Sequence, residues 1–172
     1  MPVQLTVNVS SSSRRSVSIL LSLLAITPFS VNTADLVLVR KSQARLYLIE
    51  EGRVQTSYRI ALGRNSTGHK QQAGDKRTPE GRYVLDYKKS DSAFYKSIHI
   101  SYPNQQDRLR AAARGVDPGG LIMIHGQKNG FGWLAEITQR RNWTDGCIAV
   151  TNAQMDEIWE AVTIGTPIEI IP

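Results

Sequence analysis

The 172-residue sequence has one cysteine, three histidines and no apolar stretch long enough to cross a membrane. Cys147 has no second cysteine with which to form an internal disulfide. No His, Cys and Asp residues cluster at metal-ligand spacing, so we expect neither a metal nor another cofactor. The apolar run Val17–Phe29 is shorter than the roughly 20 residues of a membrane-spanning helix. The thiol remains as the most distinctive chemical group.

The charge is mildly basic, with a net +6. The basic residues are scattered and form no long block, which favours a solvated surface and does not indicate nucleic acid binding. A weak preference for an anionic polymer is compatible with this charge. The length and the 41% hydrophobic content are those of one globular domain with a real core.

Residues 1–34 have the pattern of a secretory signal peptide. Arg14 and Arg15 precede the apolar run, and small residues follow it. We therefore expect export and a mature domain spanning residues 35–172. A buried N-terminal helix and an uncleaved anchor are the alternatives.

The mature chain begins with β-structure. Apolar runs and alternation predict a three-stranded meander: Leu36–Val39, Arg45–Glu50 and Val54–Leu62. A polar surface loop over residues 63–76 follows, in which His69 is expected to be solvated. A turn at residues 78–81 then leads to a strand, Arg82–Tyr87.

The next strand, Ser97–Tyr102, carries His99 on its polar face. This face is either solvated or a cleft wall, and His99 is a candidate substrate contact. Asn104 is expected to cap a helix over residues 105–114. The apolar patch of that helix consists of Leu109, Ala112 and Ala113.

The stretch from Leu121 to Trp159 organises the rest of the chain. Its apolar start predicts a buried strand that ends at His125, and a turn at residues 143–146 places Cys147 before a second apolar run. Thr151 and Gln154 form a capping-box pattern that opens a helix over residues 153–162. A last strand, residues 168–171, is expected to be buried.

A thiol and an imidazole at two strand ends are the parts of an activated nucleophile. The backbone N–H groups of Gly146 and Cys147 are candidate oxyanion donors. A side chain at Gly146 would block the approach of a substrate to the sulfur. Asp145 would raise the pKa of the thiol, so we expect it to point away, capping the turn or pairing with Arg140 or Arg141.

The insert Gln127–Arg141 is either a gating lid over the cysteine or a surface loop held by its aromatic residues. Gly130 and Gly132 are its expected flexible points. Phe131 and Trp133 are expected to be exposed, and Trp133 is a candidate substrate contact.

His125-Gly126, a spacer, and Thr144-x-Gly146-Cys147 followed by Asn152 resemble the signature of L,D-transpeptidases of the YkuD type. The sequence departs from that pattern at Asp145, where the family has histidine, and at Ala149, where a basic residue is common. The resemblance implies a β-rich α+β fold, a YkuD-like mixed β-sandwich with a few short helices. It also implies that the Gly126 carbonyl orients His125 and that Thr144 and Asn152 contribute to substrate binding.

The implied activity is that of a periplasmic, monomeric enzyme that modifies peptidoglycan. Cys147 would attack the diaminopimelate–D-alanine bond of a tetrapeptide stem and form a thioester, which an amine of another stem or of a lipoprotein would resolve. Three alternatives stay open: a cysteine hydrolase or amidase on the same scaffold, a non-catalytic peptidoglycan-binding module, and a structural domain with an inert buried thiol.

Overall fold

The computed structural model describes residues 33–172. The predicted signal peptide lies outside the described residues, except for Thr33 and Ala34. Within residues 33–172, none of the helices has the length and apolar character needed to span a membrane.

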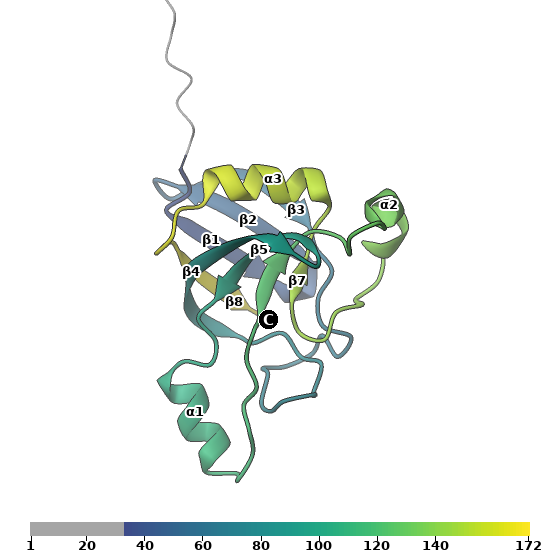
Figure 1. The fold of residues 1–172 in the computed structure, drawn as a ribbon. Helices are drawn as coiled ribbons and strands as arrows, with labels where there is room; N and C mark the ends of the chain where they lie inside the picture. Colours follow the sequence, from purple (N-terminus) through teal and green to yellow (C-terminus); the bar gives the residue numbers. More distant parts are fainter. Residues whose placement is uncertain (1–32) are drawn as a thin grey trace, which may run out of the picture. The chain divides into compact units, whose positions relative to one another are not determined.

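The described residues form one eight-stranded sheet with the order β3-β2-β1-β8-β4-β5-β6-β7 (Figure 1). The strands are β1 Leu36–Arg40, β2 Arg45–Glu50, β3 Arg53–Arg59, β4 Gly81–Ser92, β5 Tyr95–Ile100, β6 Met123–His125, β7 Ile148–Ala149 and β8 Pro167–Ile171. The helices are α1 Gln105–Ala112, α2 Ala135–Thr138 and α3 Asn152–Ala161, with short 3-10 turns at Lys41–Gln43 and Gly132–Leu134.

Strand β4 connects the two halves of the sheet. Its first residues, from Gly81 to Val84, pair with β8, and its later residues pair with β5. Apolar side chains from both halves meet in one core, which contains Val37 and Leu46 from one half and Ile98 and Ile124 from the other. This arrangement confirms the predicted β-rich α+β fold with a few short helices.

The predicted meander is present as β1, β2 and β3, but β3 ends at Arg59 instead of Leu62. The residues that follow β3 pair with the cysteine segment instead, through the bridges Ala61–Ala149 and Gly63–Thr144. The chain after β3 therefore supports the segment that carries Cys147. Strand β8 is central, as expected, between β1 and β4.

Helix α3 begins with the capping box that the sequence predicted. Thr151 Oγ1 accepts a hydrogen bond from Gln154 N–H, and the Gln154 side chain accepts one from Thr151 N–H. Met155 and Ile158 are fully buried in the core. The helix crosses one end of the sheet (Figure 1), so the residues just before it are fixed between strand β7 and a packed helix.

Helix α1 begins at the expected cap, Asn104, in a reciprocal capping box with Asp107. The apolar patch of this helix faces solvent, since Leu109 is 64% exposed and Ala112 and Ala113 are exposed too. The helix instead buries Asp107 and Ala111. The buried carboxylate, and not an apolar stripe, makes the main specific contacts of this helix.

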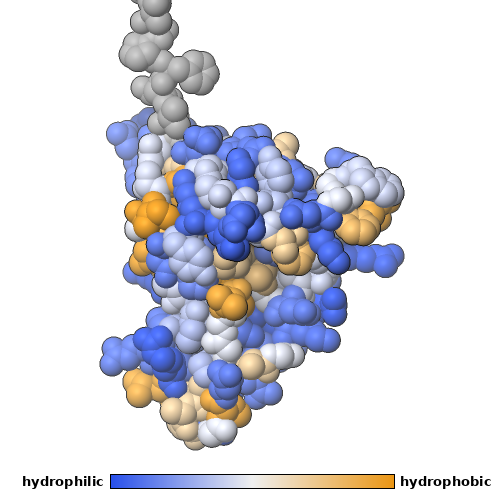
Figure 2. Space-filling model, viewed as in Figure 1, coloured by the Kyte–Doolittle hydropathy of each residue, from blue (hydrophilic) through white to orange (hydrophobic). Residues whose placement is uncertain are grey.

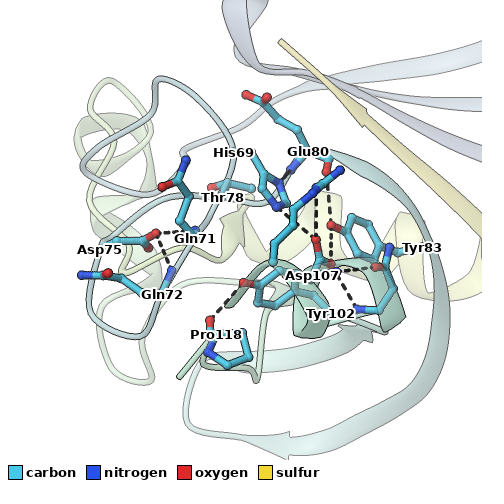
Figure 3. Close-up of polar contacts among 12 residues, drawn as sticks. His69, Gln71, Gln72, Asp75, Thr78, Glu80, Tyr83, Tyr102, Asp107 and Pro118 are labelled. Carbon is cyan, nitrogen blue, oxygen red and sulfur yellow. Dashed lines mark hydrogen bonds and ion pairs between the residues drawn. The ribbon is translucent and has the colours of Figure 1, made fainter. Parts of the chain in front are cut away.

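His69 was expected to be solvated, and this is wrong. Its Nδ1 accepts the Glu80 N–H at 2.9 Å, and its Nε2 lies 3.0 Å from Asp107 Oδ1 (Figure 3). Asp107 also accepts the hydroxyl of Tyr83 at 3.0 Å, and burial beside this carboxylate raises the pKa of Tyr83 far above its usual range. The network ties the 63–80 loop to α1 and to β4.

Candidate active site

Strands β6 and β7 place Cys147 and His125 on the same face of the sheet. They are parallel neighbours, with Ile124 opposite Ile148 and His125 opposite Ala149. Ile124 and Ile148 are fully buried in the core. Side chains alternate along a strand, so His125 and Cys147, each one residue away from this pair, face the other side. They are therefore diagonal neighbours on adjacent strands.

Both side chains line a cleft of about 550 Å³. Its aromatic and apolar walls are Tyr87, Phe94, Leu121, Met123 and Trp143, and its cationic residues are Arg64, Lys89 and Lys128. An apolar cleft with a few convergent polar groups is the usual form of a substrate site. The cations favour a substrate that carries carboxylates.

His125 is held firmly in this cleft. It is 4% exposed, and its Nδ1 lies 2.7 Å from the Gly126 carbonyl oxygen. The carbonyl can only accept a hydrogen bond, so Nδ1 carries the proton and Nε2 keeps a free lone pair. The rings of Phe94 and Trp143 lie 4.7 Å and 5.7 Å from the imidazole, centroid to centroid.

Sequence reasoning did not identify Phe94 and Trp143 as walls of the site. Phe94 comes from the turn between β4 and β5, and Trp143 from the segment that precedes the cysteine turn. Both are brought to His125 only by the pairing of distant strands, and no local pattern marks them. Burial among these groups lowers the pKa of His125, partly opposed by the Gly126 carbonyl.

The Cys147 sulfur lies 3.6 Å from the Leu121 carbonyl oxygen. Burial raises the pKa of this thiol, and the charge of Asp145 raises it further, whereas the Met123 amide and the Lys70 charge oppose the rise. Together with the lowered pKa of His125, this leaves an uncharged thiol beside an uncharged imidazole at neutral pH. The pair is suited to base-assisted attack, in which the imidazole takes the thiol proton as the new bond forms.

Thr144 is buried and organises the turn that carries Cys147. Its Oγ1 donates to the Cys147 carbonyl at 2.7 Å and accepts the Gly146 N–H at 3.2 Å. Its backbone N–H donates to the Leu62 carbonyl, and its backbone carbonyl accepts the Arg64 N–H. Thr144 lines the cleft, but its hydroxyl is occupied by the turn, so its part is to position the cysteine.

Gly146 is required by packing against the chain itself. It has φ +133°, and a Cβ added there would lie 2.8 Å from the Arg77 carbonyl oxygen. The expected reason, interference with a substrate that approaches the sulfur, stays a prediction, and the structure adds this packing reason to it. The Gly146 N–H donates to Thr144 Oγ1, which leaves the Cys147 N–H as the better candidate oxyanion donor.

Asp145 points outward, as expected, but its predicted partners are wrong. The carboxylate is 74% exposed and lies 3.6 Å from Arg64 Nη1, and no ion pair joins it to Arg140 or Arg141. Arg64 is brought to the turn by the Gly63–Thr144 bridge. The sequence could not indicate this, because the two residues lie in separate segments.

His99 does not line the cleft. Its Nδ1 lies 2.6 Å from Asp86 Oδ1, and its ring stacks on Tyr87 with centroids 4.5 Å apart. Tyr87 lines the cleft, so His99 supports a cleft wall from behind.

Asn152 also lies outside the cleft lining, and it holds the start of the insert. Its Oδ1 accepts the Gln127 N–H at 2.8 Å. A Cβ at Gly126 would lie 2.7 Å from Asn152 Oδ1, and one at Gly132 would lie 2.8 Å from Asn152 Nδ2. Gly132 is therefore a packing position and not the flexible point that we expected, whereas Gly130 has open space around it.

The insert contains a short helix, α2, that the sequence analysis did not predict. It projects from the sheet and carries apolar surface (Figures 1 and 2). Phe131 and Trp133 are exposed, as expected, and Ile137 is exposed too. Trp133 is 78% exposed and does not line the cleft.

Within residues 33–172, no three His, Cys, Asp or Glu side chains lie close enough together to hold a metal ion.

Residues 34–170 match the L,D-transpeptidase catalytic domain family, YkuD. YafK of Escherichia coli strain K12, a protein named for an inferred L,D-transpeptidase activity, is 36% identical over 116 residues, which is 66% of this chain and 39% of YafK. The chain thus spans about two fifths of the length of this curated relative.

Two crystal structures have similar folds. The helical cell shape determining protein Pgp2 of Campylobacter jejuni aligns with a TM-score of 0.61 and 28% identity, over 78% of this chain and 46% of Pgp2. The L,D-transpeptidase of Xylanimonas cellulosilytica aligns with a TM-score of 0.53 and 19% identity, over 84% of this chain and 63% of that one. Because the family model matches most of its length, the chain belongs to the L,D-transpeptidase catalytic domain family.

Proposed function

We propose that this protein is a peptidoglycan L,D-transpeptidase that uses Cys147 as its nucleophile and His125 as its general base. The observation that carries this proposal is the arrangement of the two side chains. They lie on one face of neighbouring strands, in one cleft, and the Gly126 carbonyl leaves His125 Nε2 as the free base. The family match and the cationic residues of the cleft support an acidic stem peptide as the substrate.

In the first half of the reaction, His125 Nε2 takes the thiol proton while the sulfur attacks the diaminopimelate carbonyl. The Cys147 N–H is the donor that we assign to the developing oxyanion. The C–N bond to D-alanine then breaks, and His125 returns the proton to the leaving amine. The product is a thioester on Cys147 together with free D-alanine.

In the second half, an amine from another stem attacks the thioester. A C–N bond forms, the C–S bond breaks, and the proton of the amine passes through His125 to the sulfur. A wall-anchored lipoprotein would present an amine of the same chemistry. Pgp2 is named as a helical cell shape determining protein, and we include a role in cell shape in this proposal.

The test is mass analysis of tetrapeptide muropeptides incubated with the protein and with its Cys147→Ala variant. Stem dimers joined through two diaminopimelates, absent with the variant, are the expected products. Cysteine-dependent tripeptide without dimers would instead support the hydrolase. Absence of any cysteine-dependent product would contradict both enzymes and favour a peptidoglycan-binding module.

We also propose that the protein acts in the periplasm as a monomer. The pattern of residues 1–34 supports export. Cell fractionation with N-terminal sequencing tests export, and an uncleaved cytoplasmic product would contradict it. Sedimentation at several concentrations tests the monomer, which a concentration-dependent mass would contradict.

A further inference from the structure

Cys147 lies between two cavities, and Asp145 lines both of them. The second cavity has a volume of about 280 Å³ and shares Leu121, Asp145 and Cys147 with the larger cleft. An acyl transfer has two substrates, and both must reach the same sulfur-bound carbonyl. A carboxylate beside that carbonyl therefore meets whichever substrate enters from the second side.

Asp145 gives no help to the formation of the nucleophile. Its negative charge raises the pKa of the Cys147 thiol, which disfavours the thiolate. Its ion pair with Arg64 joins two exposed side chains 3.6 Å apart. Such exposed pairs contribute little to stability, with a median of about 0–1 kcal/mol. Neither activation of the thiol nor stability accounts for a carboxylate at this position.

The second half of the proposed reaction supplies a role for this charge. An alkyl amine has a pKa near 10, so the acceptor arrives at neutral pH as an ammonium ion. The weak pairing with Arg64 leaves most of the Asp145 carboxylate open to an ammonium group. A charge-assisted hydrogen bond to this carboxylate would hold the amine next to the thioester.

The walls of the second cavity suit an amine on a slender chain. Ala73, Gly74, Gly119 and Gly120 line it, and none of them has a side chain larger than a methyl group. Lys70 also lines this cavity, but its ammonium is buried and bonded to the Asp75 carboxylate at 2.8 Å. Asp145 is therefore the exposed carboxylate that an entering cation meets first.

We propose that Asp145 binds the ammonium group of the acyl acceptor on the side of the second cavity and selects cationic amines as acceptors. This inference rests on the proposed transpeptidase function. The bound ammonium releases one proton to solvent, and its nitrogen attacks the thioester carbonyl. The C–N bond forms and the C–S bond breaks. A second proton, which the nitrogen loses after it has attacked, passes through His125 to the Cys147 sulfur. Asp145 binds the acceptor and takes no proton from it.

The experiment compares two acceptors on the thioester formed from the same tetrapeptide stem. One is a stem with a free diaminopimelate amine, which is cationic at neutral pH, and the other is hydroxylamine, which is neutral there. Asp145→Asn should lower transfer to the stem amine roughly tenfold, the size expected for one charge-assisted hydrogen bond, mainly through the KM of the acceptor. Transfer to hydroxylamine should stay unchanged.

Two variants complete the design. Asp145→Glu keeps the charge and should retain most of the transfer to the amine. Asp156→Asn removes a carboxylate that is also half-exposed and paired with a cation, Lys96 at 2.7 Å, and neither residue of this pair lines either cavity. This control variant should leave transfer to both acceptors unchanged. Equal thermal unfolding midpoints would show that all variants are folded.

If Asp145→Asn lowered transfer to both acceptors equally, or lowered transfer to neither, the role of Asp145 would be overturned. The proposed transpeptidase function would still stand. Absence of cysteine-dependent product from the unmodified protein would overturn the proposed function and this inference with it. The two failures are thus distinguished by the unmodified protein alone.

Discussion

Replacing Thr144 by valine should weaken the turn that carries Cys147 without changing its backbone pairing. The hydroxyl makes two hydrogen bonds inside the turn, to the Cys147 carbonyl at 2.7 Å and from the Gly146 N–H at 3.2 Å. Valine has nearly the same shape but cannot make either bond. Both partners then lose their contact in a site where Thr144 is only 4% exposed.

The expected magnitude follows from these two contacts. A buried polar group that loses its partner costs roughly 1–3 kcal/mol. The Gly146 N–H is buried, whereas the Cys147 carbonyl is partly accessible and can turn to water. We therefore expect Thr144→Val to lower the free energy of unfolding by about 2–3 kcal/mol. That is a large share of the roughly 5–15 kcal/mol of a typical domain.

Thr144→Ser is the matched control. It keeps the hydroxyl and loses one methyl group, for which we expect a loss of about 1 kcal/mol. Urea unfolding followed by circular dichroism measures both variants, with an unchanged dependence on denaturant. The alkylation rate of Cys147 in the folded state gives a second reading and should rise only with valine. If valine were as stable as serine within about 0.5 kcal/mol, the hydroxyl would not hold the turn.

Three further results are expected. The pKa of His125 is lower in the folded chain than in the unfolded chain, so at mildly acidic pH the unfolded chain binds a proton that the folded chain does not. The contribution of neutral His125 to the free energy of unfolding is therefore fully present above the ordinary imidazole pKa and is lost as the pH falls toward the lower folded value. His125→Gln should remove this part of the pH dependence of the urea midpoint, and an unchanged profile would contradict it. Gly146→Ala should lower the free energy of unfolding by well over about 2 kcal/mol, because backbone strain adds to a 2.8 Å contact with the Arg77 carbonyl oxygen. Gly165→Ala is the control, since it has backbone strain alone at φ +98° and no atom within 4 Å of the added Cβ. Equal thermal midpoints of the two variants would refute the packing argument. Asn152→Ala should lower the free energy of unfolding by about 1–2 kcal/mol and speed proteolysis of the insert, because the 2.8 Å hydrogen bond from the Gln127 N–H is lost. An unchanged cleavage rate would count against this role of Asn152.

Much of the fold could be predicted because apolar alternation and caps are local signals. The meander, the last strand and the capping box of α3 all depend on residues within one short window. The errors arise where burial is decided by distant partners. The environment of His69 was misjudged, because its partner Asp107 is buried on a helix far from it in sequence.

The candidate site divides in the same way. Cys147 and His125 could be singled out because a lone thiol and a strand-end imidazole stand out in the sequence itself. The partner of Asp145 could not be found, because Arg64 reaches it only through a bridge between two segments. Strand alternation left His99 either on a solvated face or on a cleft wall, and it does not show that His99 stacks on Tyr87, which lines the cleft while His99 does not.

The uncharged state of the site bears on how a lone thiol would serve the exported enzyme that we propose. The thiolate is the species that oxidants and alkylating agents attack, and its fraction falls as the thiol pKa rises. Burial and Asp145 raise that pKa, so resting Cys147 is protected. A substrate amine bound at Asp145 would add a positive charge beside the sulfur and remove part of this effect. Alkylation of Cys147 should accordingly be faster in Asp145→Asn than in the unmodified protein, and an equal rate would refute this link.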